Sequence, residues 1–197
     1  MFAKRLFDIV TSAVALLILL PVLFACAVWI SIDSPGGFFY RQERVGRNGK
    51  LFYMLKFRSM FTGSDSKGLL TVGNNDVRIT RSGNFLRKTK LDELPQLINV
   101  FIGDMSFVGP RPEVLKYVRL YSDEQKKVLE VRPGITDLAS IQYRNENEVL
   151  AKFDNPEQAY ITQVMPDKLR INLEYLAQRN FLTDIKIILK TVSAIIK

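Results

Sequence analysis

Residues 85–101 read FLRKTKLDELPQLINVF, and the rest of the chain is organised around this stretch. Pro95 is tolerated best in the first turn of a helix, because its missing N–H needs no acceptor there. Apolar residues recur at helical spacing in the second half of the stretch: Leu91, Leu94, Leu97, Ile98 and Phe101. The pattern therefore predicts a helix that begins near Leu91 or Asp92.

Two adjacent carboxylates, Asp92 and Glu93, stand at the predicted helix start, directly behind the basic residues Arg87, Lys88 and Lys90. Both carboxylates point away from the apolar stripe. A helix N-terminus is also a place that favours phosphate oxygens. The same residues suit an ordinary helix start, because Asp is a common N-cap and Glu is favoured in a first turn. This stretch alone leaves both a structural and a chemical role open.

The composition limits the chemistry that the chain can perform. Its 197 residues suffice for one domain with a core, and its net charge of +8 indicates an anionic partner. The sequence contains no histidine, which excludes Ser-His and Cys-His nucleophilic sites and the usual zinc sites. The single cysteine, Cys26, excludes an intrachain disulfide. Covalent or acid–base chemistry must therefore use carboxylates, Lys, Tyr, Ser or Thr.

An apolar run near the N-terminus predicts membrane insertion. Residues 9–32 contain no charged side chain over 24 positions, which is long enough to span a bilayer as a helix. Basic residues flank both ends of the run, and basic flanks prefer the cytoplasm, which conflicts with a simple crossing. Pro21 interrupts the run and would break or kink a helix there. We therefore expect residues 1–33 to form a re-entrant membrane helix and residues 34–197 to form a cytoplasmic catalytic domain. One kinked spanning helix is the alternative.

The next segment predicts a β-hairpin. Strands are expected over residues 38–45 and 50–60, and Asn-Gly at the end of the intervening Gly46–Gly49 is a strong turn signal. Lys56 and Arg58 are two residues apart in the second strand, so they are expected to project from one face. This pair suits either a solvated edge strand or a phosphate contact.

A stiff segment, Gly109-Pro110-Arg111-Pro112, follows the predicted central helix. Two prolines fix the backbone around Arg111. Such rigidity is useful if the guanidinium must meet an anion in a fixed geometry, although a structural turn is the alternative. Residues 61–73, rich in Gly, Ser, Thr and Asp, predict a loop.

The C-terminal half reads as mainly helical, and the whole chain as an α+β fold with one β-hairpin. Ser122 is expected to cap the helix predicted at residues 123–131. The last helix is amphipathic, which suits either a membrane interface or docking on the core. We expect helices over residues 113–121, 123–131, 156–165, 166–178 and 183–197, with a turn at 132–136.

The ordered motifs resemble those of one family. They are KRLFD at residues 4–8, RQERVGRNGKLFYMLKFRSM at 41–60, the run from NNDVRIT to GPRP at 74–112, and VRPGIT at 131–136. Together they resemble the small monotopic phosphoglycosyl transferases, also called the bacterial sugar transferase family, over nearly the whole chain. The resemblance implies an enzyme at the cytoplasmic face of the bacterial inner membrane. Such an enzyme uses Mg²⁺ to move a phosphosugar from a UDP-sugar to a polyprenol (undecaprenyl) phosphate, releases UMP, and starts glycoconjugate biosynthesis.

The resemblance also implies residue roles. Asp92 would be the nucleophile that carries the phosphosugar as an acyl phosphate, and Glu93 would position Asp92 or bind Mg²⁺ with it. Pro21 would be the break in the membrane helix. The implied phosphate-binding residues are Lys56, Arg58, Arg78, Arg87, Arg111 and Arg144.

Two segments depart from the family pattern. Leu20 stands where the family often has Ser before the membrane proline, which removes a hydroxyl that could satisfy carbonyls at the break. Asp137–Ser140 reads DLAS, where Gly-Trp or Gly-Leu followed by Ala-Gln is usual, so this region is a candidate for sugar specificity. The expected partners are a UDP-sugar, polyprenol phosphate and membrane lipids, with a homodimer left open.

Two other classes of protein compete with the enzyme. One is a non-catalytic membrane-anchored adaptor that binds a nucleotide-sugar or a lipid, against which the adjacent Asp92 and Glu93 argue. The other is a membrane-tethered nucleic-acid binder. We expect no nucleic-acid partner, because the basic residues are not interleaved with exposed aromatics in a known binding module.

Overall fold

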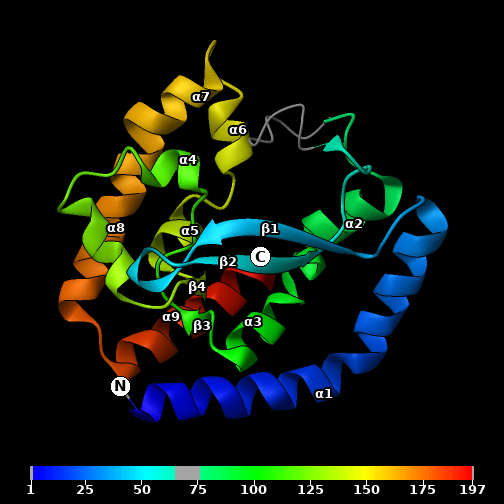
Figure 1. Ribbon diagram of the computed structural model, residues 1–197, viewed down its shortest axis with the longest axis horizontal. Coiled ribbons are helices and arrows are strands. Elements are labelled where there is room, and N and C mark those ends of the chain that lie inside the picture. Colours follow the sequence, from blue (N-terminus) through cyan, green and yellow to red (C-terminus); the bar gives the residue numbers. More distant parts are fainter. Residues whose placement is uncertain (1, 65–75, 197) are drawn as a thin grey trace.

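The computed structural model describes residues 2–64 and 76–196 (Figure 1). The described chain is mostly helical, with one long apolar N-terminal helix and two small sheets, which confirms the expected mainly helical fold with a hairpin. The predicted loop at 61–73 lies largely outside the described residues. The helices are α1 (Phe2–Asp33), α2 (Arg81–Thr89), α3 (Gln96–Ile102), α4 (Leu115–Val118), α5 (Leu138–Gln142), α6 (Glu146–Leu150), α7 (Pro156–Ala159), α8 (Met165–Gln178) and α9 (Phe181–Ile196).

The predicted hairpin is present. Strands β1 (Phe39–Val45) and β2 (Leu51–Phe57) pair antiparallel. Asn48 and Gly49 in the connecting turn have φ of +57° and +75°, the left-handed region that Asn and Gly tolerate best. The second strand ends at Phe57, so Arg58 lies beyond it and does not project with Lys56 as the alternation predicted.

A second sheet was not predicted. Strands β3 (Ser106–Val108) and β4 (Gly134–Thr136) pair in parallel, although the sequence predicted a turn at 132–136 and no strand at 106–108. The backbone of Gly109, just after β3, packs closely against Gly134 of β4, since a Cβ on Gly134 would lie 2.2 Å from the Gly109 nitrogen. This contact fixes the segment that carries Arg111 against the end of β4.

Several helix boundaries differ from the predictions. Of the helix expected at 113–121, only α4 is α-helical, and α9 begins two residues before the expected 183. Leu91–Glu93 form a separate 3₁₀ turn, and α3 begins only at Gln96, after Pro95. Residues 125–130 also form a 3₁₀ helix, although the hydroxyl of Ser122 accepts the N–H of residue 125, as a cap does. Finally, α7 continues into α8 through a π-helical turn, Tyr160–Val164, so Pro166 does not begin a separate helix.

Helix α1 wraps around one edge of the molecule and bends part-way along (Figure 1). The helix continues through Pro21, whose ring cannot be accommodated in a straight helix without a bend. Its N-terminal end docks on the domain: Lys4 pairs with Asp184 at 2.6 Å, and Asp8 accepts a 2.9 Å hydrogen bond from the Ser106 hydroxyl.

The C-terminal end of α1 docks on the same domain. Cys26 and Ile30 are buried with Phe57 and Leu86, and the Asp33 carboxylate accepts the Ser82 N–H at 2.8 Å. Between the docked ends the helix is strongly apolar and exposed, at Val10, Val14, Leu17, Ile18, Leu20, Phe24 and Val28. One domain thus holds both ends of a long helix whose middle presents apolar side chains outward.

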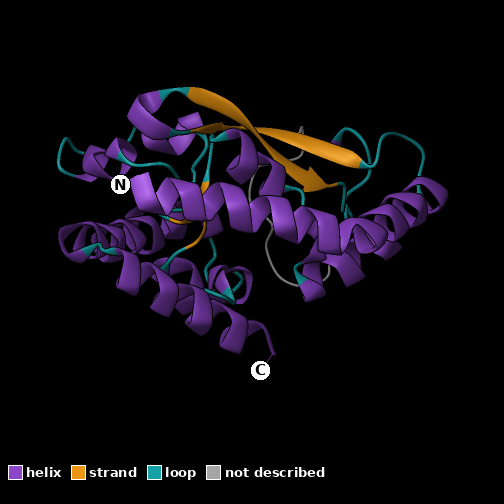
Figure 2. Cartoon of the chain, turned by 90° about the horizontal axis from the view of Figure 1, so that it is seen from below, coloured by secondary structure: helices purple, strands orange, loops and turns teal. Residues whose placement is uncertain are grey.

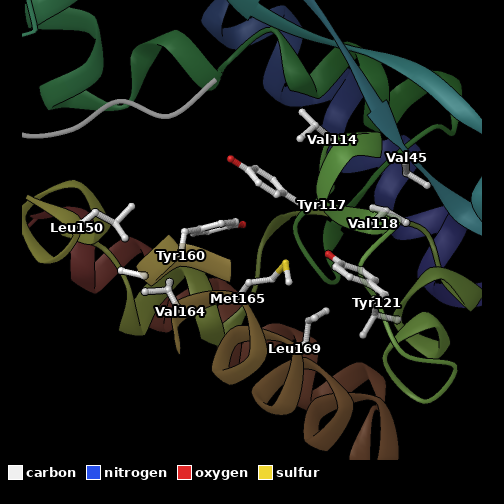
Figure 3. Close-up of a cluster of buried hydrophobic side chains, with 12 residues drawn as sticks. Val45, Val114, Tyr117, Val118, Tyr121, Leu150, Tyr160, Val164, Met165 and Leu169 are labelled. Carbon is white, nitrogen blue, oxygen red and sulfur yellow. The ribbon is translucent and has the colours of Figure 1, made fainter. Parts of the chain in front are cut away.

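The main core lies where the end of the hairpin meets α4 and the continuous helix formed by α7, the π-helical turn and α8 (Figure 3). It contains Val45, Val114, Tyr117, Val118, Tyr121, Val128, Leu150, Ala159, Tyr160, Val164, Met165 and Leu169. Helix α9 lies on the opposite side of the molecule from the hairpin (Figure 2). It docks on the core through Ile187, which is buried with Val108 and Tyr175. Its other side exposes Leu182, Leu189 and Val192, so docking leaves an apolar face uncovered.

Candidate active site

A cavity of about 980 Å³ lies beneath the hairpin. Its walls come from β1 and β2, the 3₁₀ turn at 91–93, the Pro110–Pro112 segment, α5 and α8. Cations and carboxylates line one region, including Lys56, Asp92, Glu93 and Arg111. The sequence stretch with the two carboxylates therefore opens into the large cavity of the described chain.

Asp92 sits in the 3₁₀ turn and is only 8% exposed. Lys90 just before the turn adopts a left-handed conformation, with φ of +59°, which ends α2 and directs the chain into the turn. Within the described part of the protein, the Oδ1 atom of Asp92 is buried without a hydrogen-bond partner. Burial and the neighbouring Glu93 raise the pKa of Asp92. The site thus holds one carboxylate oxygen that is shielded from water and has no hydrogen-bond partner among the described residues.

Glu93 faces Arg111. Both carboxylate oxygens of Glu93 accept hydrogen bonds from the guanidinium, one of them at 3.2 Å from Nη1. The Lys56 ammonium lies 3.9 Å from the same carboxylate. Burial works to raise the pKa of Glu93, but Arg111 and Lys56 outweigh it and hold the pKa at about 2. Glu93 is therefore ionised and committed to a bidentate ion pair, the strong geometry for Arg and carboxylate.

Arg111 is fixed from its backbone as well as by the two flanking prolines. Its N–H donates to Asp137 Oδ2 at 2.7 Å, and its Nη1 donates to the Ile135 carbonyl at 3.2 Å. Asp137 is 1% exposed and caps α5 by accepting the Ser140 N–H at 2.5 Å. Arg111 therefore meets Glu93 from a segment that β4 and Asp137 hold in place.

Lys56 projects from the cavity face of β2 and is largely buried. Burial lowers the pKa of Lys56 to about 8, against the opposing effect of Glu93. The ammonium is thus mainly charged at neutral pH and loses its charge just above it. It adds a positive charge next to the Glu93–Arg111 pair.

The amino-acid sequence matches the family described as "Bacterial sugar transferase" over residues 1–197. The chain belongs to the bacterial sugar transferase family. The expected resemblance is thereby confirmed, and the protein is a member of a family of transferases.

Curated relatives of this sugar transferase have related names. The UDP-glucose:undecaprenyl-phosphate glucose-1-phosphate transferase of Escherichia coli K12 is 38% identical over 96% of the chain. The matched region is 39% of the length of that relative. The UDP-N-acetylgalactosamine-undecaprenyl-phosphate N-acetylgalactosaminephosphotransferase of Aeromonas hydrophila is 33% identical over 99% of the chain and 44% of its own length. The uncharacterized sugar transferase EpsL of Bacillus subtilis is 40% identical over 100% of the chain and 88% of its own length.

Three further basic residues that the sequence singled out line the cavity of this sugar transferase. Arg87, in the last turn of α2, lines the cavity and lowers the pKa of Asp92 in opposition to burial. Arg78 lines it too, with its Nη2 atom paired to Asp76 at 2.6 Å. Arg144 is exposed at the cavity wall and donates to the carbonyl of Ala194.

Arg58 makes contacts within the protein that the sequence did not predict. Its guanidinium is buried and donates to the carbonyls of Ser34, at 2.8 Å, and Pro35. Longer contacts reach the carbonyls of Ile30 and Gly36 at 3.5 and 3.4 Å. Ser34, Pro35 and Gly36 directly follow α1, so Arg58 holds the segment just beyond the end of that helix.

Asp137 is the site residue whose role the sequence did not predict. It stood out only as a departure from the family pattern, whereas the structure places it as the acceptor that fixes Arg111 and α5. No local signal connects residues 26 positions apart, since the contact depends on the pairing of β3 with β4.

Proposed function

We propose that this chain transfers a phosphosugar from a UDP-sugar to a polyprenol phosphate, such as undecaprenyl phosphate, and releases UMP. The observation that carries the proposal is the buried Asp92 oxygen without a partner, beside the Glu93–Arg111 pair and Lys56 in one cavity. The printed names of the relatives support the same substrates and reaction.

In the first step, an Asp92 carboxylate oxygen attacks the β-phosphorus of the UDP-sugar. The bond between this phosphorus and the bridging oxygen breaks, and UMP leaves with the electron pair. An aspartyl-phosphosugar remains, in which the carboxylate has become an acyl phosphate. Two anions must meet, so the positive charges of Lys56, Arg87 and Arg111 lower the barrier by neutralising phosphate oxygens.

In the second step, a phosphate oxygen of the polyprenol phosphate attacks the phosphorus of this intermediate. The acyl phosphate bond breaks, Asp92 recovers its carboxylate, and the sugar leaves on a polyprenyl diphosphate. The acceptor is an amphiphile, so the site must lie at a membrane surface. This first membrane-bound step supplies bacterial glycoconjugate biosynthesis.

A magnesium ion fits the Asp92 side of the site. Mg²⁺ is usually held by one or two carboxylates together with phosphate oxygens and water, and Asp92 offers a free oxygen. Glu93 is committed to Arg111, and the described residues contain no cluster of three candidate ligands, so few protein ligands are expected. We propose that Asp92 and the substrate phosphates hold the ion, which when bound adds positive charge at the diphosphate.

We also propose that α1 enters and leaves the bacterial inner membrane on its cytoplasmic face. A straight helix of its length would extend about 48 Å, more than the 30 Å hydrocarbon core. Yet Lys4 at one end and Asp33 at the other contact the same domain. The bend near the middle and the basic flanks agree with a re-entrant path.

Cysteine labelling tests this path. Single cysteines at the exposed positions Phe2 and Ile32, in a chain with Cys26→Ala, are treated with a membrane-impermeant maleimide. Both should react only when the reagent reaches the cytoplasmic face. Labelling of the two positions from opposite faces would establish a spanning helix instead.

The transferase proposal is tested by UMP release from a panel of UDP-sugars, with Mg²⁺ and undecaprenyl phosphate in detergent. The wild type is compared with Asp92→Asn and with Asp123→Asn, a matched change at an exposed carboxylate. We expect UMP from wild type and Asp123→Asn, and none from Asp92→Asn, because an amide is a poor nucleophile. Full turnover by Asp92→Asn would exclude the covalent mechanism. UDP-sugar binding without turnover by the wild type would favour a non-catalytic adaptor.

A further inference from the structure

We propose that Ser140 and Asn172 form the subsite that binds hydroxyl or acetamido groups of the sugar ring. The inference rests on the proposed transfer from a UDP-sugar, and it assigns a binding role to residues outside the charged part of the site. Both residues line the same cavity as Asp92 and Glu93.

The evidence begins with two polar atoms that have no partner. Asn172 is 5% exposed, and its Oδ1 atom accepts no hydrogen bond from the described residues. The Ser140 Oγ atom is buried and lacks a partner within the same described part. A buried polar atom without a hydrogen bond is costly, so such atoms are usually satisfied by a ligand or a bound water.

The positions of the two residues place these atoms in the cavity wall. Met165, Lys168, Leu169 and Asn172 of α8 line the cavity at the spacing of one helix face. Helix α5, which carries Ser140, packs on α8. An amide and a hydroxyl, neutral groups that can each donate and accept, therefore line adjoining walls.

Asp137 ties this wall to the phosphate region. One of its oxygens accepts the N–H of Arg111, and the other accepts the N–H of Ser140. The sugar ring is joined to the β-phosphate through a single oxygen, so groups that recognise the ring must lie close to groups that bind this phosphate. Ser140 is fixed to Arg111 through one carboxylate, which meets that requirement.

The reaction order favours the sugar over the uridine as occupant. UMP leaves after the first step, whereas the phosphosugar stays on Asp92 until the second. A rigid wall tied to Arg111 suits the fragment that is retained through both steps. A neutral pair also suits hydroxyl groups, since uncharged hydrogen-bonding sites discriminate strongly when a substrate group is missing.

The test measures kcat/KM for pairs of UDP-sugars that differ at one ring substituent, such as UDP-glucose with UDP-galactose. The variants are Ser140→Ala, Asn172→Leu and the control Thr162→Ala, which removes an exposed hydroxyl outside the cavity lining. We expect each cavity variant to lower kcat/KM for the preferred sugar about three- to tenfold, the effect of one neutral hydrogen bond. The ratio between the paired sugars should change, while inhibition by UDP and UMP should not.

Titration of the Asp92→Asn variant with UDP-sugars and with UDP separates this inference from the transferase proposal. Weaker UDP-sugar binding after Ser140→Ala or Asn172→Leu, at constant UDP affinity, supports the subsite even without turnover. Equal losses for UDP and UDP-sugars would assign the pair to the nucleoside and overturn the proposal. An unchanged ratio of kcat/KM between the paired sugars would overturn the proposal too. If the melting temperature fell while this ratio stayed the same, the two residues would have only a structural role.

Discussion

Replacing Arg58 by Met should destabilise the protein without weakening its affinity for the UDP-sugar. The guanidinium is buried and donates to the carbonyls of Ser34 and Pro35 at the end of α1. Met keeps much of the apolar stem of Arg but is shorter and offers no donor. The carbonyl of Ser34 would then lose its bond to Arg58, and the carbonyl of Pro35 would keep only the 3.3 Å bond from the Thr62 hydroxyl.

The size of the effect follows from those contacts. A hydrogen bond to a charged group contributes about 1.5–3 kcal/mol, so the loss of two gives about 3–6 kcal/mol. In a chain of this length each kcal/mol lowers the melting temperature by about 2–4 °C, so a fall of at least about 6 °C is expected. The two longer contacts of Arg58, to Ile30 and Gly36, are left out of this value.

Thermal unfolding in lipid nanodiscs, followed by UMP release well below the melting temperature, measures both quantities. Arg41→Met provides the control, because Arg41 lies exposed on β1. Arg58→Met should melt lower than wild type while KM for the UDP-sugar stays within about twofold, the scatter expected for a residue outside the phosphate site. An unchanged melting temperature combined with a large rise in KM would refute the structural role and restore Arg58 as a phosphate ligand.

Three further changes test the site and its support. Raising the pH through about 8 should raise KM for the UDP-sugar as Lys56 loses its charge, and Lys56→Arg should remove this rise. Between this pKa and 10.5, Lys56 is protonated in the unfolded chain and mostly neutral in the folded one. The contribution of Lys56 to the free energy of unfolding therefore increases as the pH rises through this range, so its deprotonation does not explain lost activity by unfolding. Glu93→Gln removes the ionic partner of Arg111, which should cost about 3 kcal/mol and lower the melting temperature by about 6–12 °C in a denaturation scan. Gly83→Ala should yield little folded protein on size-exclusion chromatography, because its Cβ would lie 2.0 Å from a backbone oxygen, whereas Gly37→Ala, with its nearest atom at 4.0 Å, should fold normally.

Local signals in the sequence predicted the hairpin and the helical character of most of the chain. Asn48 and Gly49 determine their turn through their own backbone preferences, so no distant partner is needed. The parallel pairing of Ser106–Val108 with Gly134–Thr136 could not be predicted in this way. Each strand has three residues, too few for a periodic pattern, and the pairing depends on backbones brought together by the fold.

The candidate site was predictable in part. Asp92 and Glu93 stood out because they are adjacent, and Arg111 because two prolines flank it. Arg58 and Arg111 looked alike in the sequence, yet one donates to carbonyls just beyond α1 and the other to Glu93. An arginine can satisfy either kind of acceptor, so the assignment depends on which group the fold places within reach.

The docking of both ends of α1 on one domain has a consequence for the lipid environment. A helix that crosses a bilayer must match its hydrophobic thickness, and it tilts or strains when the two differ. In the proposed path, α1 occupies one leaflet, and Lys4 and Asp33 hold it at a fixed height relative to Asp92. The distance between the carboxylate and the headgroup layer is then set by the protein and not by the bilayer, so turnover should vary little between lipids of different acyl chain length.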